Sequence, residues 1–309
     1  TIYKKGRWMN KGWLVNDCLT CIPGTKTLWH DLLEWMPNLI DKTNGYTDFR
    51  YLADTIESQV ATDRPDYIIR NASYFRKLNI DTFTISLMQD PFNDSQLDVL
   101  NSSDVVVFNS EYMRQSCGGL IKPKKEKVIP LGIDFDFFRP LGKGFRKELG
   151  IPERAVLFIG ADNRWKGFDR VRRLIDNTDL NFCLVMKDDV SINNHKCRTF
   201  NCVDHKTLLK IINSCSICLC LSEMETQHLS SIEAGACGLP VVTTNVGIHY
   251  NRSGDGWGEK IPNGATINQI SHIIHQALDT KYNTRDLFIQ MGYDKKSCLK
   301  NWRRLLDDR

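Results

Sequence analysis

Short apolar runs alternate with longer amphipathic stretches along the whole chain of 309 residues. Short apolar runs between turn residues are typical of strands that are buried on both faces of a sheet. The longer stretches, such as 28–39 and 168–176, have the apolar spacing of helices. This alternation predicts parallel sheets that are covered by helices. The predicted strands lie at 66–69, 82–87, 104–108, 155–160, 182–186, 216–221 and 240–244.

The strand–helix pattern occurs twice, and a break rich in proline and glycine separates the two halves at 130–144. A chain of this length can bury two separate cores. We therefore expect an α/β protein with two Rossmann-like, doubly wound domains facing across a cleft, divided between residues 140 and 141. Ligands of such sheets bind beyond the carboxyl ends of the strands.

Charge is distributed unevenly between the two halves. The whole chain has a net charge of +4, and residues 1–140 contribute −1 while residues 141–309 contribute +5. The excess of positive charge in the second half suits a small anionic ligand there.

The chain has eleven cysteines, an odd number, and several lie inside apolar runs such as 217–221. This usage indicates reduced, buried thiols in a cytoplasmic protein. The Cys-x-x-Cys pairs at 18–21 and 215–218 lack a matching histidine cluster, so we expect no zinc site. No stretch contains the ~20 apolar residues that cross a bilayer, so no integral membrane segment is expected.

Two acidic residues follow the predicted strand at 216–221. Glu225 lies in a polar turn and Glu233 in a helix that we expect to begin at Ser230 or Ser231, both good N-cap residues. Carboxylates accept hydrogen bonds from sugar and ribose hydroxyls, and the free N–H groups of a helix N-terminus attract phosphate. A capping box between Ser230 and Glu233 is an alternative explanation without a ligand.

A basic loop follows the predicted strand at 155–160. Arg164 and Lys166 lie in this loop, and Gly167 opens the next helix. Two cations at the mouth of a strand suit a diphosphate leaving group, whose developing charge needs fixed positive partners. The alternative is a basic turn that only contacts solvent.

These two stretches together resemble the E-x7-E signature of retaining GT-B glycosyltransferases of family 4, the glycosyl transferases group 1. The resemblance implies that Glu233 binds the ribose and that Glu225 faces the transferred sugar. The turn reads Thr-Gln-His where the family usually has Gly-Phe-Gly or Gly-Phe-Pro, so we expect an altered sugar pocket. The resemblance also assigns the residues between the two carboxylates to donor binding: Thr226, Gln227, His228, Leu229 and Ser230.

The basic loop resembles the family's Gly-Arg-x-x-x-x-Lys-Gly motif, with Lys166 and Gly167 in the expected places. The family's arginine is replaced by Ala161, and we expect Arg164 to substitute for it. Lys166, Arg164 and Glu225 are thus the predicted catalytic residues. The resemblance further implies that Phe200 and Cys202 lie near the nucleotide base, that no metal is needed, and that 289–309 is a helix crossing back to the amino-terminal domain.

The amino-terminal half is expected to bind the acceptor. Gly24 and Thr25 lie in a loop that resembles the family's first glycine loop, and Gln89 with Asp90 stands where many relatives have His-Asp. An amide at residue 89 can form hydrogen bonds but cannot shuttle protons. A plain turn or a core position explains each of these residues equally well.

The sequence therefore predicts a glycosyltransferase that moves a sugar from a nucleoside diphosphate sugar, with UDP-sugar favoured, to a hydroxyl with retention of configuration. No other cofactor is expected, and the default acceptor is a glycan or a lipid-linked sugar. One alternative acceptor is a hydroxymethylated base of viral DNA, since Trp8, Trp13, Trp29 and Trp35 and the lysines at 122–127 could contact DNA. A second alternative is a non-catalytic subunit that binds sugar nucleotides.

Overall fold

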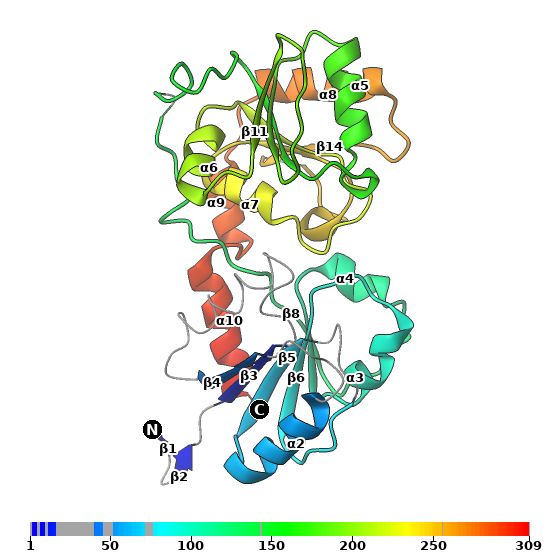
Figure 1. Ribbon diagram of the computed structural model, residues 1–309, viewed down its shortest axis with the longest axis vertical. Helices are drawn as coiled ribbons and strands as arrows, with labels where there is room; N and C mark the ends of the chain where they lie inside the picture. Colours follow the sequence, from blue (N-terminus) through cyan, green and yellow to red (C-terminus); the bar gives the residue numbers. More distant parts are fainter. Residues whose placement is uncertain are drawn as a thin grey trace. The chain divides into compact units, whose positions relative to one another are not determined.

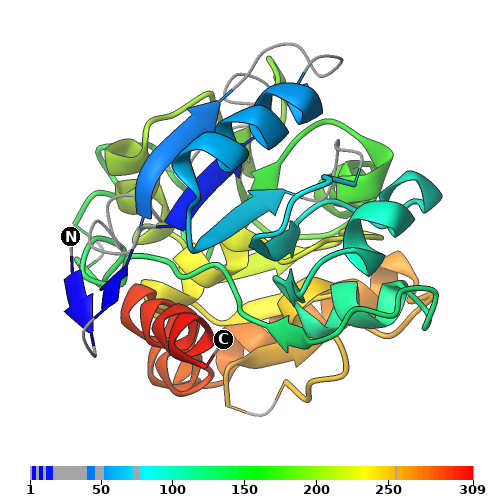
Figure 2. The ribbon, with the colours of Figure 1, turned by 90° about the horizontal axis from the view of Figure 1, so that it is seen from below.

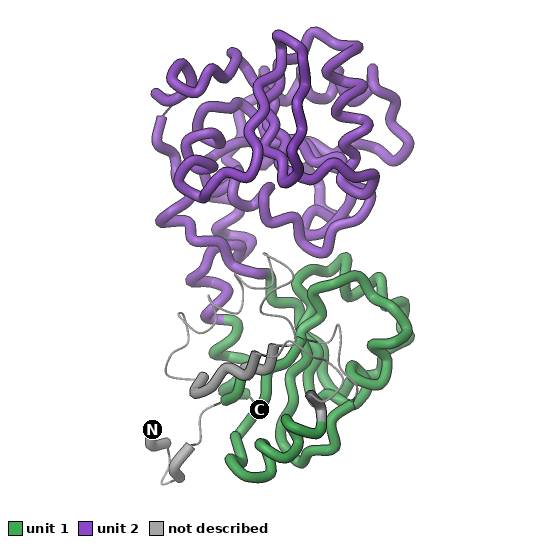
Figure 3. Tube along the Cα trace, viewed as in Figure 1, with its two compact units in different colours: residues 1–130, 301–309 green, residues 131–300 purple. Residues whose placement is uncertain are grey.

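The structure, a computed structural model, describes residues 2–4, 7–9, 12–16, 40–45, 52–71, 77–142, 144–254 and 256–308. The chain forms two compact units, residues 1–130 with 301–309 and residues 131–300 (Figure 3). Each unit contains a parallel sheet with helices packed on it (Figure 1). The prediction of two doubly wound α/β domains is confirmed. The predicted boundaries at 140 and 288, and the cleft, stay predictions.

The sheet of unit 1 has the strand order β4-β3-β5-β6-β7-β8, with every neighbouring pair parallel. Its later strands follow the predicted apolar runs, and β7 is buried along its whole length. A small antiparallel pair, β1 (Ile2–Lys4) and β2 (Arg7–Met9), precedes the sheet. The sheet strands are β3 (Gly12–Asn16), β4 (Ile40–Gly45), β5 (Tyr67–Asn71), β6 (Phe83–Met88), β7 (Val105–Phe108) and β8 (Glu126–Val128).

Short helices connect these strands, and apolar side chains of α2 and α3 pack against the sheet. Ile56 of α2 and Leu100 of α3 join Ile68, Val106 and Phe108 in one buried cluster. This burial is the main stabilising contribution to unit 1, since each fully buried large aliphatic side chain contributes about 1.5–3 kcal/mol. The helices are α2 (Leu52–Asp63), the 3-10 turn η1 (Asp94–Gln96), α3 (Leu97–Asn101) and α4 (Glu111–Ser116).

The sheet of unit 2 has the order β11-β10-β9-β12-β13-β14 and is parallel throughout. Counted along this unit, the order is that of the dinucleotide-binding Rossmann sheet, whose ligand site lies where the order reverses. That point falls here between β9 and β12. The strands are β9 (Val156–Gly160), β10 (Phe182–Met186), β11 (Cys197–Asn201), β12 (Ile217–Cys220), β13 (Val241–Thr243) and β14 (Gly258–Lys260).

Alternate residues of the central strands enter two different cores. Val156 and Phe158 belong to one buried cluster, and Leu157 between them belongs to the other. Helices therefore cover both faces of the sheet, as a run of consecutive apolar residues predicts. The helices of this unit are α5 (Phe168–Asn177), α6 (His205–Ile212), α7 (Leu229–Ala236), α8 (Ile267–Asp279) and α9 (Thr284–Gln290), with 3-10 turns η2 (Arg164–Lys166) and η3 (Gly247–His249).

The last helix, α10 (Lys295–Asp307), begins in unit 2, and its residues from Asn301 onward belong to unit 1. Figure 2 shows this helix in red, ending at the C-terminus. Trp302 and Leu305 are buried on it. No helix in the described part of the chain has the length and apolar character that a membrane crossing requires.

Candidate active site

The carboxyl ends of β9 and β12, at the point where the strand order reverses, are the first feature of the site. These two strands pair only at Ile217 with Val156 and at Cys218 with Leu157, so their last residues are not paired with each other. The loop that follows β9 carries Lys166, and the turn that follows β12 carries Glu225. The switch point of the sheet thus brings together the two stretches that the sequence singled out.

Lys166 and Glu225 form an ion pair between the two loops, with Lys166 Nζ 2.6 Å from Glu225 Oε1. Ser222 Oγ donates a second hydrogen bond of 2.6 Å to the same carboxylate oxygen. Burial raises the pKa of Glu225, but His228 and Lys166 outweigh it and hold the pKa below its ordinary value. Glu225 is therefore ionised at neutral pH, and it anchors the ammonium group of Lys166.

The backbone around Lys166 is fixed by short-range contacts. Asn163 Oδ1 accepts a 2.9 Å hydrogen bond from Lys166 N and caps the 3-10 turn η2. Gly167 follows with φ +70°, and a Cβ at this position would overlap the carbonyl of Leu221. Glycine is thus needed both for the left-handed conformation and for the close approach of the β12 turn.

The start of α7 differs from the sequence expectation. The helix begins at Leu229, and its N-cap is His228, which has φ 71° and ψ 67° and makes no side-chain cap. The predicted helix start at Ser230 or Ser231 is wrong, and the alternative of a capping box between Ser230 and Glu233 is not formed, because the helix already begins at Leu229. Ser231 Oγ instead donates to His228 O at 2.8 Å. Among the described residues, no acceptor faces the backbone N–H groups of Leu229 and Ser230.

Glu233 lies one turn into α7, half-buried, and its carboxylate makes no hydrogen bond or ion pair with any described residue. Burial raises the pKa of Glu233 to about 7, with His228 opposing that shift. A carboxylate that is removed from water without a donor is costly, and a ligand hydroxyl can supply that donor. The arrangement therefore favours a ligand at Glu233 over the capping explanation.

In the turn between the two glutamates, the side chains of Gln227 and Leu229 contact other parts of unit 2. Gln227 is buried, and its amide accepts from Leu131 N and donates to Leu131 O, each at 2.8 Å. Leu229 packs against the core of unit 2. Thr226 and Ser230 are half-buried, and Ser230 Oγ lies 3.5 Å from His228 Nε2. Gln227 and Leu229 therefore offer a ligand only their backbone groups.

His228 is buried below the turn, and its imidazole interacts with the Cys220 thiol. Burial lowers the pKa of His228, but the neighbouring Cys220 and Glu225 outweigh it and raise the pKa above its ordinary value. Although burial raises the pKa of Cys220, His228 lowers it below its usual range. The shifts of these two groups favour a protonated imidazole that is paired with the Cys220 sulfur, close to Glu225.

Arg164 is less engaged than Lys166. Its side chain is 83% exposed and lies 3.8 Å from Glu223 Oε2, while Trp165 O accepts a 2.9 Å hydrogen bond from Glu223 N. The structure thus places Lys166, and not Arg164, in the ion pair with Glu225. The catalytic role of Arg164 stays a prediction.

The residues predicted to bind the base lie at the carboxyl end of β11. The loops that carry Lys166 and Glu225 also leave the carboxyl ends of their strands. Phe200 is half-buried, with the guanidinium of Arg198 5.0 Å from its ring centre. Cys202 is exposed, has φ 51°, and donates through its thiol to Lys187 O at 2.9 Å. Their contact with a base stays a prediction.

In unit 1, Gln89 directly follows β6 and Asn109 directly follows β7. Met88 and Phe108 are paired in the sheet, so Gln89 and Asn109 lie at neighbouring strand ends. Both side chains are buried, and Gln89 Nε2 and Asn109 Oδ1 have no partner in the described part of the chain. Asp90 is half-buried beside them. Gly24 and Thr25 lie outside the described residues.

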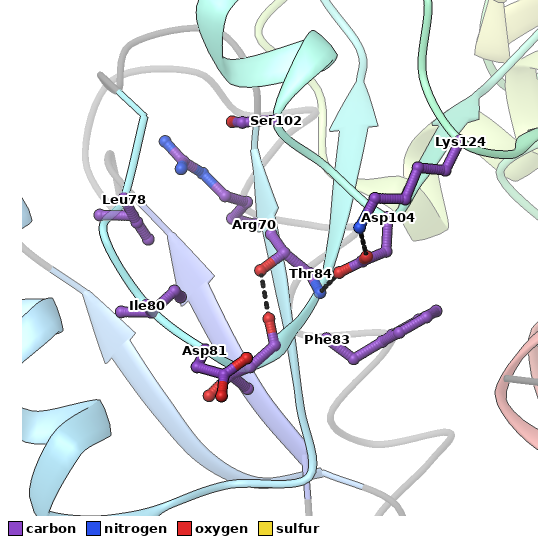
Figure 4. Close-up of a pocket in the computed structure, with 10 residues that line it drawn as sticks. Arg70, Leu78, Ile80, Asp81, Phe83, Thr84, Ser102, Asp104 and Lys124 are labelled. Carbon is purple, nitrogen blue, oxygen red and sulfur yellow. Dashed lines mark hydrogen bonds and ion pairs between the residues drawn. The ribbon is translucent and has the colours of Figure 1, made fainter.

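A pocket of about 280 Å³ also occurs in unit 1, near the start of β6 and β7 (Figure 4). Asp104 lines it, accepts from Thr84 N at 2.9 Å and pairs with Lys124 at 2.6 Å. This is the amino end of these strands, opposite to the end at which parallel sheets bind ligands. No group of three or more metal-ligating side chains occurs among the residues that the structure describes.

Sequence reasoning missed several residues that support the site, including Ser222, Asn109, His249 and Lys260. Ser222 and Asn109 could have been found from the sequence, since Asn109 directly follows the buried strand β7 and Ser222 lies two residues after the buried strand β12. His249 and Lys260 carry none, because only the folded sheet brings them beside the turn.

Comparison with known sequences finds one family model that matches part of the second unit. Residues 153–278 match the family model described as glycosyl transferases group 1. This range runs from before β9 to the end of α8 and contains Lys166, Glu225 and Glu233. Among curated protein sequences, none matches the chain.

Solved structures give the fold of the whole chain. Sucrose-phosphate synthase from Thermosynechococcus elongatus matches with TM-score 0.77 and 14% identity over 97% of this chain and 99% of that chain. The chain has the GT-B fold.

Two further GT-B structures match over nearly the full length. Anabaena HepE in complex with UDP has TM-score 0.77 and 13% identity, covering 97% of this chain and 100% of that chain. A glycosyltransferase from Rickettsia africae has TM-score 0.72 and 14% identity, covering 97% and 98%. At such low identity these likenesses show the GT-B fold, and the reaction has to be argued from the site.

Proposed function

We propose that the chain is a retaining glycosyltransferase that takes a sugar from a nucleoside diphosphate sugar, with UDP-sugar favoured. The observation that carries this proposal is the unpartnered carboxylate of Glu233, one helical turn from the open N–H groups at the start of α7. A ribose needs an acceptor for its hydroxyls, and a diphosphate needs donors and positive charge. The turn after β12 and the start of α7 supply the acceptor and the N–H donors, and Lys166 of the loop after β9 supplies the positive charge.

In this proposal the diphosphate lies between Lys166 and the N-terminus of α7. The ammonium of Lys166 is already held in place by Glu225 and the η2 turn, so little reorganisation is needed as charge develops on the leaving group. The raised pKa of His228 supports additional positive charge there. These groups provide the stabilisation that a metal would otherwise supply, and we propose no metal.

Glu225 faces the transferred sugar in this proposal. Its Oε1 is occupied by Lys166 and Ser222. The other carboxylate oxygen can accept from a sugar hydroxyl while the pair with Lys166 stays intact. The acceptor hydroxyl attacks from the face of the departing diphosphate, so no protein nucleophile is required and configuration is retained.

The preference for UDP rests on a solved structure that is similar to this chain. HepE of Anabaena has been solved in complex with UDP and in complex with UDP and glucose. Its fold matches this chain over nearly the full length of both. We therefore favour UDP-sugar, although the side chains described at the end of β11 do not by themselves select a base.

A sugar or lipid-linked sugar is the proposed acceptor, bound by unit 1. Gln89 Nε2 and Asn109 Oδ1 are a buried donor and a buried acceptor at neighbouring strand ends. A single hydroxyl can satisfy both, because it accepts one hydrogen bond and donates another. WaaB, another structural neighbour, is described as a lipopolysaccharide outer core galactosyltransferase. A cytoplasmic location is proposed because none of the described cysteines forms a disulfide.

The test is a thermal-shift screen of the purified chain against UDP-, GDP- and ADP-sugars, followed by an assay for hydrolysis of the best donor. Stabilisation by a UDP-sugar with slow release of UDP supports the proposal. Stabilisation without any release of nucleotide, even with candidate acceptors, favours a non-catalytic binding subunit. The absence of stabilisation by every donor contradicts the proposal.

A further inference from the structure

Lys260, the last residue of β14, is a half-buried lysine whose ammonium group, among the described residues, contacts only neutral oxygens. Its Nζ lies 2.5 Å from His249 O, 2.9 Å from Asn245 Oδ1 and 3.4 Å from Thr244 O. An ammonium group has three protons, and all three are directed to the loop 244–251. Lys260 therefore ties both ends of this loop to the sheet.

The environment of Lys260 does not favour its charge. Burial lowers the pKa of Lys260 to about 8, and the nearby Cys220 opposes this shift. A desolvated ammonium without a carboxylate partner contributes little to folding stability. Its main structural consequence is therefore the geometry of the loop that it holds.

The loop 244–251 supports the turn between β12 and α7. Thr244 Oγ1 donates to Ser222 O at 2.6 Å, and Ile248 N donates to Gln227 O at 3.2 Å. Gly247 packs closely on the same carbonyl, because a Cβ there would lie 2.7 Å from Gln227 O. Both ends of the turn that carries Glu225 thus rest on this loop.

The loop also supports the start of α7 through His249. His249 Nε2 lies 2.7 Å from Ser231 Oγ, and Ser231 uses its one proton to bond His228 O at 2.8 Å. His249 Nε2 must therefore be the donor. Burial, with His228 and Lys260 nearby, holds the pKa of His249 well below its ordinary value, so the ring stays neutral. Stacking on Trp257, 4.8 Å between ring centres, fixes the ring plane.

Two hydrogen-bonded routes thus lead from Lys260 to the site. One runs through Thr244 and Ser222 to the Glu225 carboxylate. The other runs through His249 and Ser231 to the backbone of His228, the N-cap of α7. Both routes end on groups that hold the donor in the proposed function.

We propose that Lys260 is a positioning residue for donor binding, which holds the loop 244–251 against the turn 222–228 and the start of α7. This proposal rests on the proposed function, because it assumes that the turn binds a nucleoside diphosphate. It does not require Lys260 to touch the donor.

The test compares UDP binding by the wild type, Lys260→Met and Lys260→Arg, using calorimetric titration. Lys260→Met keeps the apolar stem but removes all three donors, and we expect UDP to bind about tenfold more weakly. The thermal midpoint is expected to stay equal or to rise, because a buried charge is removed. Lys260→Arg, which retains charge and donors, should recover most of the affinity. The matched control is Lys296→Met, at an exposed lysine 3.5 Å from Asp136.

Amide hydrogen exchange adds a local readout. The Ile248 amide, which bonds Gln227 O, should exchange faster in Lys260→Met than in the wild type, while amides of β9 and β10 stay unchanged. Equal UDP affinity in the wild type and Lys260→Met would overturn this proposal alone. A general loss of stability that Lys260→Arg does not restore would also overturn it. Failure of the wild type to bind UDP, GDP and ADP would overturn the proposed function together with this inference.

Discussion

Lys166 Nζ and Glu225 Oε1 lie 2.6 Å apart, although the two residues come from different loops of unit 2. Each loop leaves the carboxyl end of its own strand, and the two strands separate beyond Leu157 and Cys218. The pair therefore lies at the switch point of a Rossmann sheet. It joins the basic loop and the acidic turn into one site before any ligand is present.

Removal of Lys166 should abolish most of the donor turnover. In Lys166→Ala, Glu225 keeps Ser222 but loses its cation, and the leaving group loses its closest fixed positive charge. We expect kcat/KM for the donor to fall about 10²–10³-fold, as for other lost electrostatic contacts to a developing charge. Steady-state kinetics with the best nucleotide sugar measures this.

The control for this variant is Lys296→Ala, which removes an exposed lysine of the same unit. It should retain wild-type kinetics. Wild-type turnover by a folded Lys166→Ala protein would show that Lys166 does not contact the leaving group.

The unfolding free energy and the UDP affinity are both expected to depend on pH through Glu233. Its folded pKa is about 7, raised from an ordinary 4.5. Between these values the folded protein holds a proton that the unfolded chain has released, so the free energy of unfolding falls as pH rises through this window. Only the ionised form offers full acceptor capacity to a ribose, so UDP affinity should rise as pH passes about 7.

Glu233→Gln should remove both effects. The variant should be as stable as the wild type at pH ~8 or more stable, because no charge has to be buried. Titrations of UDP at several pH values, beside denaturant unfolding at the same values, measure the two trends. Retention of the wild-type pH dependence in Glu233→Gln would assign it to another group.

Much of this site follows from short-range sequence patterns. The runs that became β9, β10 and β12 are unbroken apolar segments, and Gly167 follows Lys166 at the spacing of a strand-to-helix loop. These features depend on neighbouring residues, so a single sequence carries them. The two doubly wound α/β domains follow in the same way from the repeated alternation of strand and helix, whereas the GT-B assignment came from the resemblance of the E-x7-E stretch.

Other features depend on contacts between distant segments, and the sequence does not reveal them. β11 is an edge strand with a half-exposed, polar composition, so its apolar signal is weak. The N-cap at His228 contradicts local capping preferences, because the turn is held by Leu131 and by the loop 244–251. Local propensity is overridden there by tertiary contacts.

Gln227 is expected to contribute to the stability of the fold more than to the transfer reaction. Gln227→Ala leaves Leu131 N and Leu131 O without their side-chain partner. The lost hydrogen bonds should cost about 1–3 kcal/mol of unfolding free energy. Thermal or denaturant unfolding measures this, and Gln276→Ala, at an exposed position on α8, is the control. An unchanged stability would mean that the Leu131 contact contributes nothing.

A substitution at Gly167 tests whether the loop after β9 packs closely against Leu221, which follows β12. In Gly167→Ala the new Cβ overlaps the Leu221 carbonyl, and the residue also has to keep a positive φ. Gly150→Ala is a matched control, because φ is +64° there and nothing lies within 4 Å of the added Cβ. Both variants carry the backbone strain of about 1–2 kcal/mol, and only Gly167→Ala carries the overlap.

We expect Gly167→Ala to be clearly less stable than Gly150→Ala and to lose donor turnover, because the overlap displaces Lys166 from Glu225. Unfolding curves and donor kinetics for the two variants measure the difference. Equal behaviour of the two alanine variants would contradict the close packing of these loops.

The most direct test of the donor site is the calorimetric titration of UDP into the wild type and into Glu233→Ala at pH ~8, where the Glu233 carboxylate is ionised. The site described here predicts saturable binding of one UDP to the wild type and a loss of at least about tenfold in affinity in the variant, with the fold intact. Equal affinity of UDP for the two proteins, or no binding by the wild type, would contradict it.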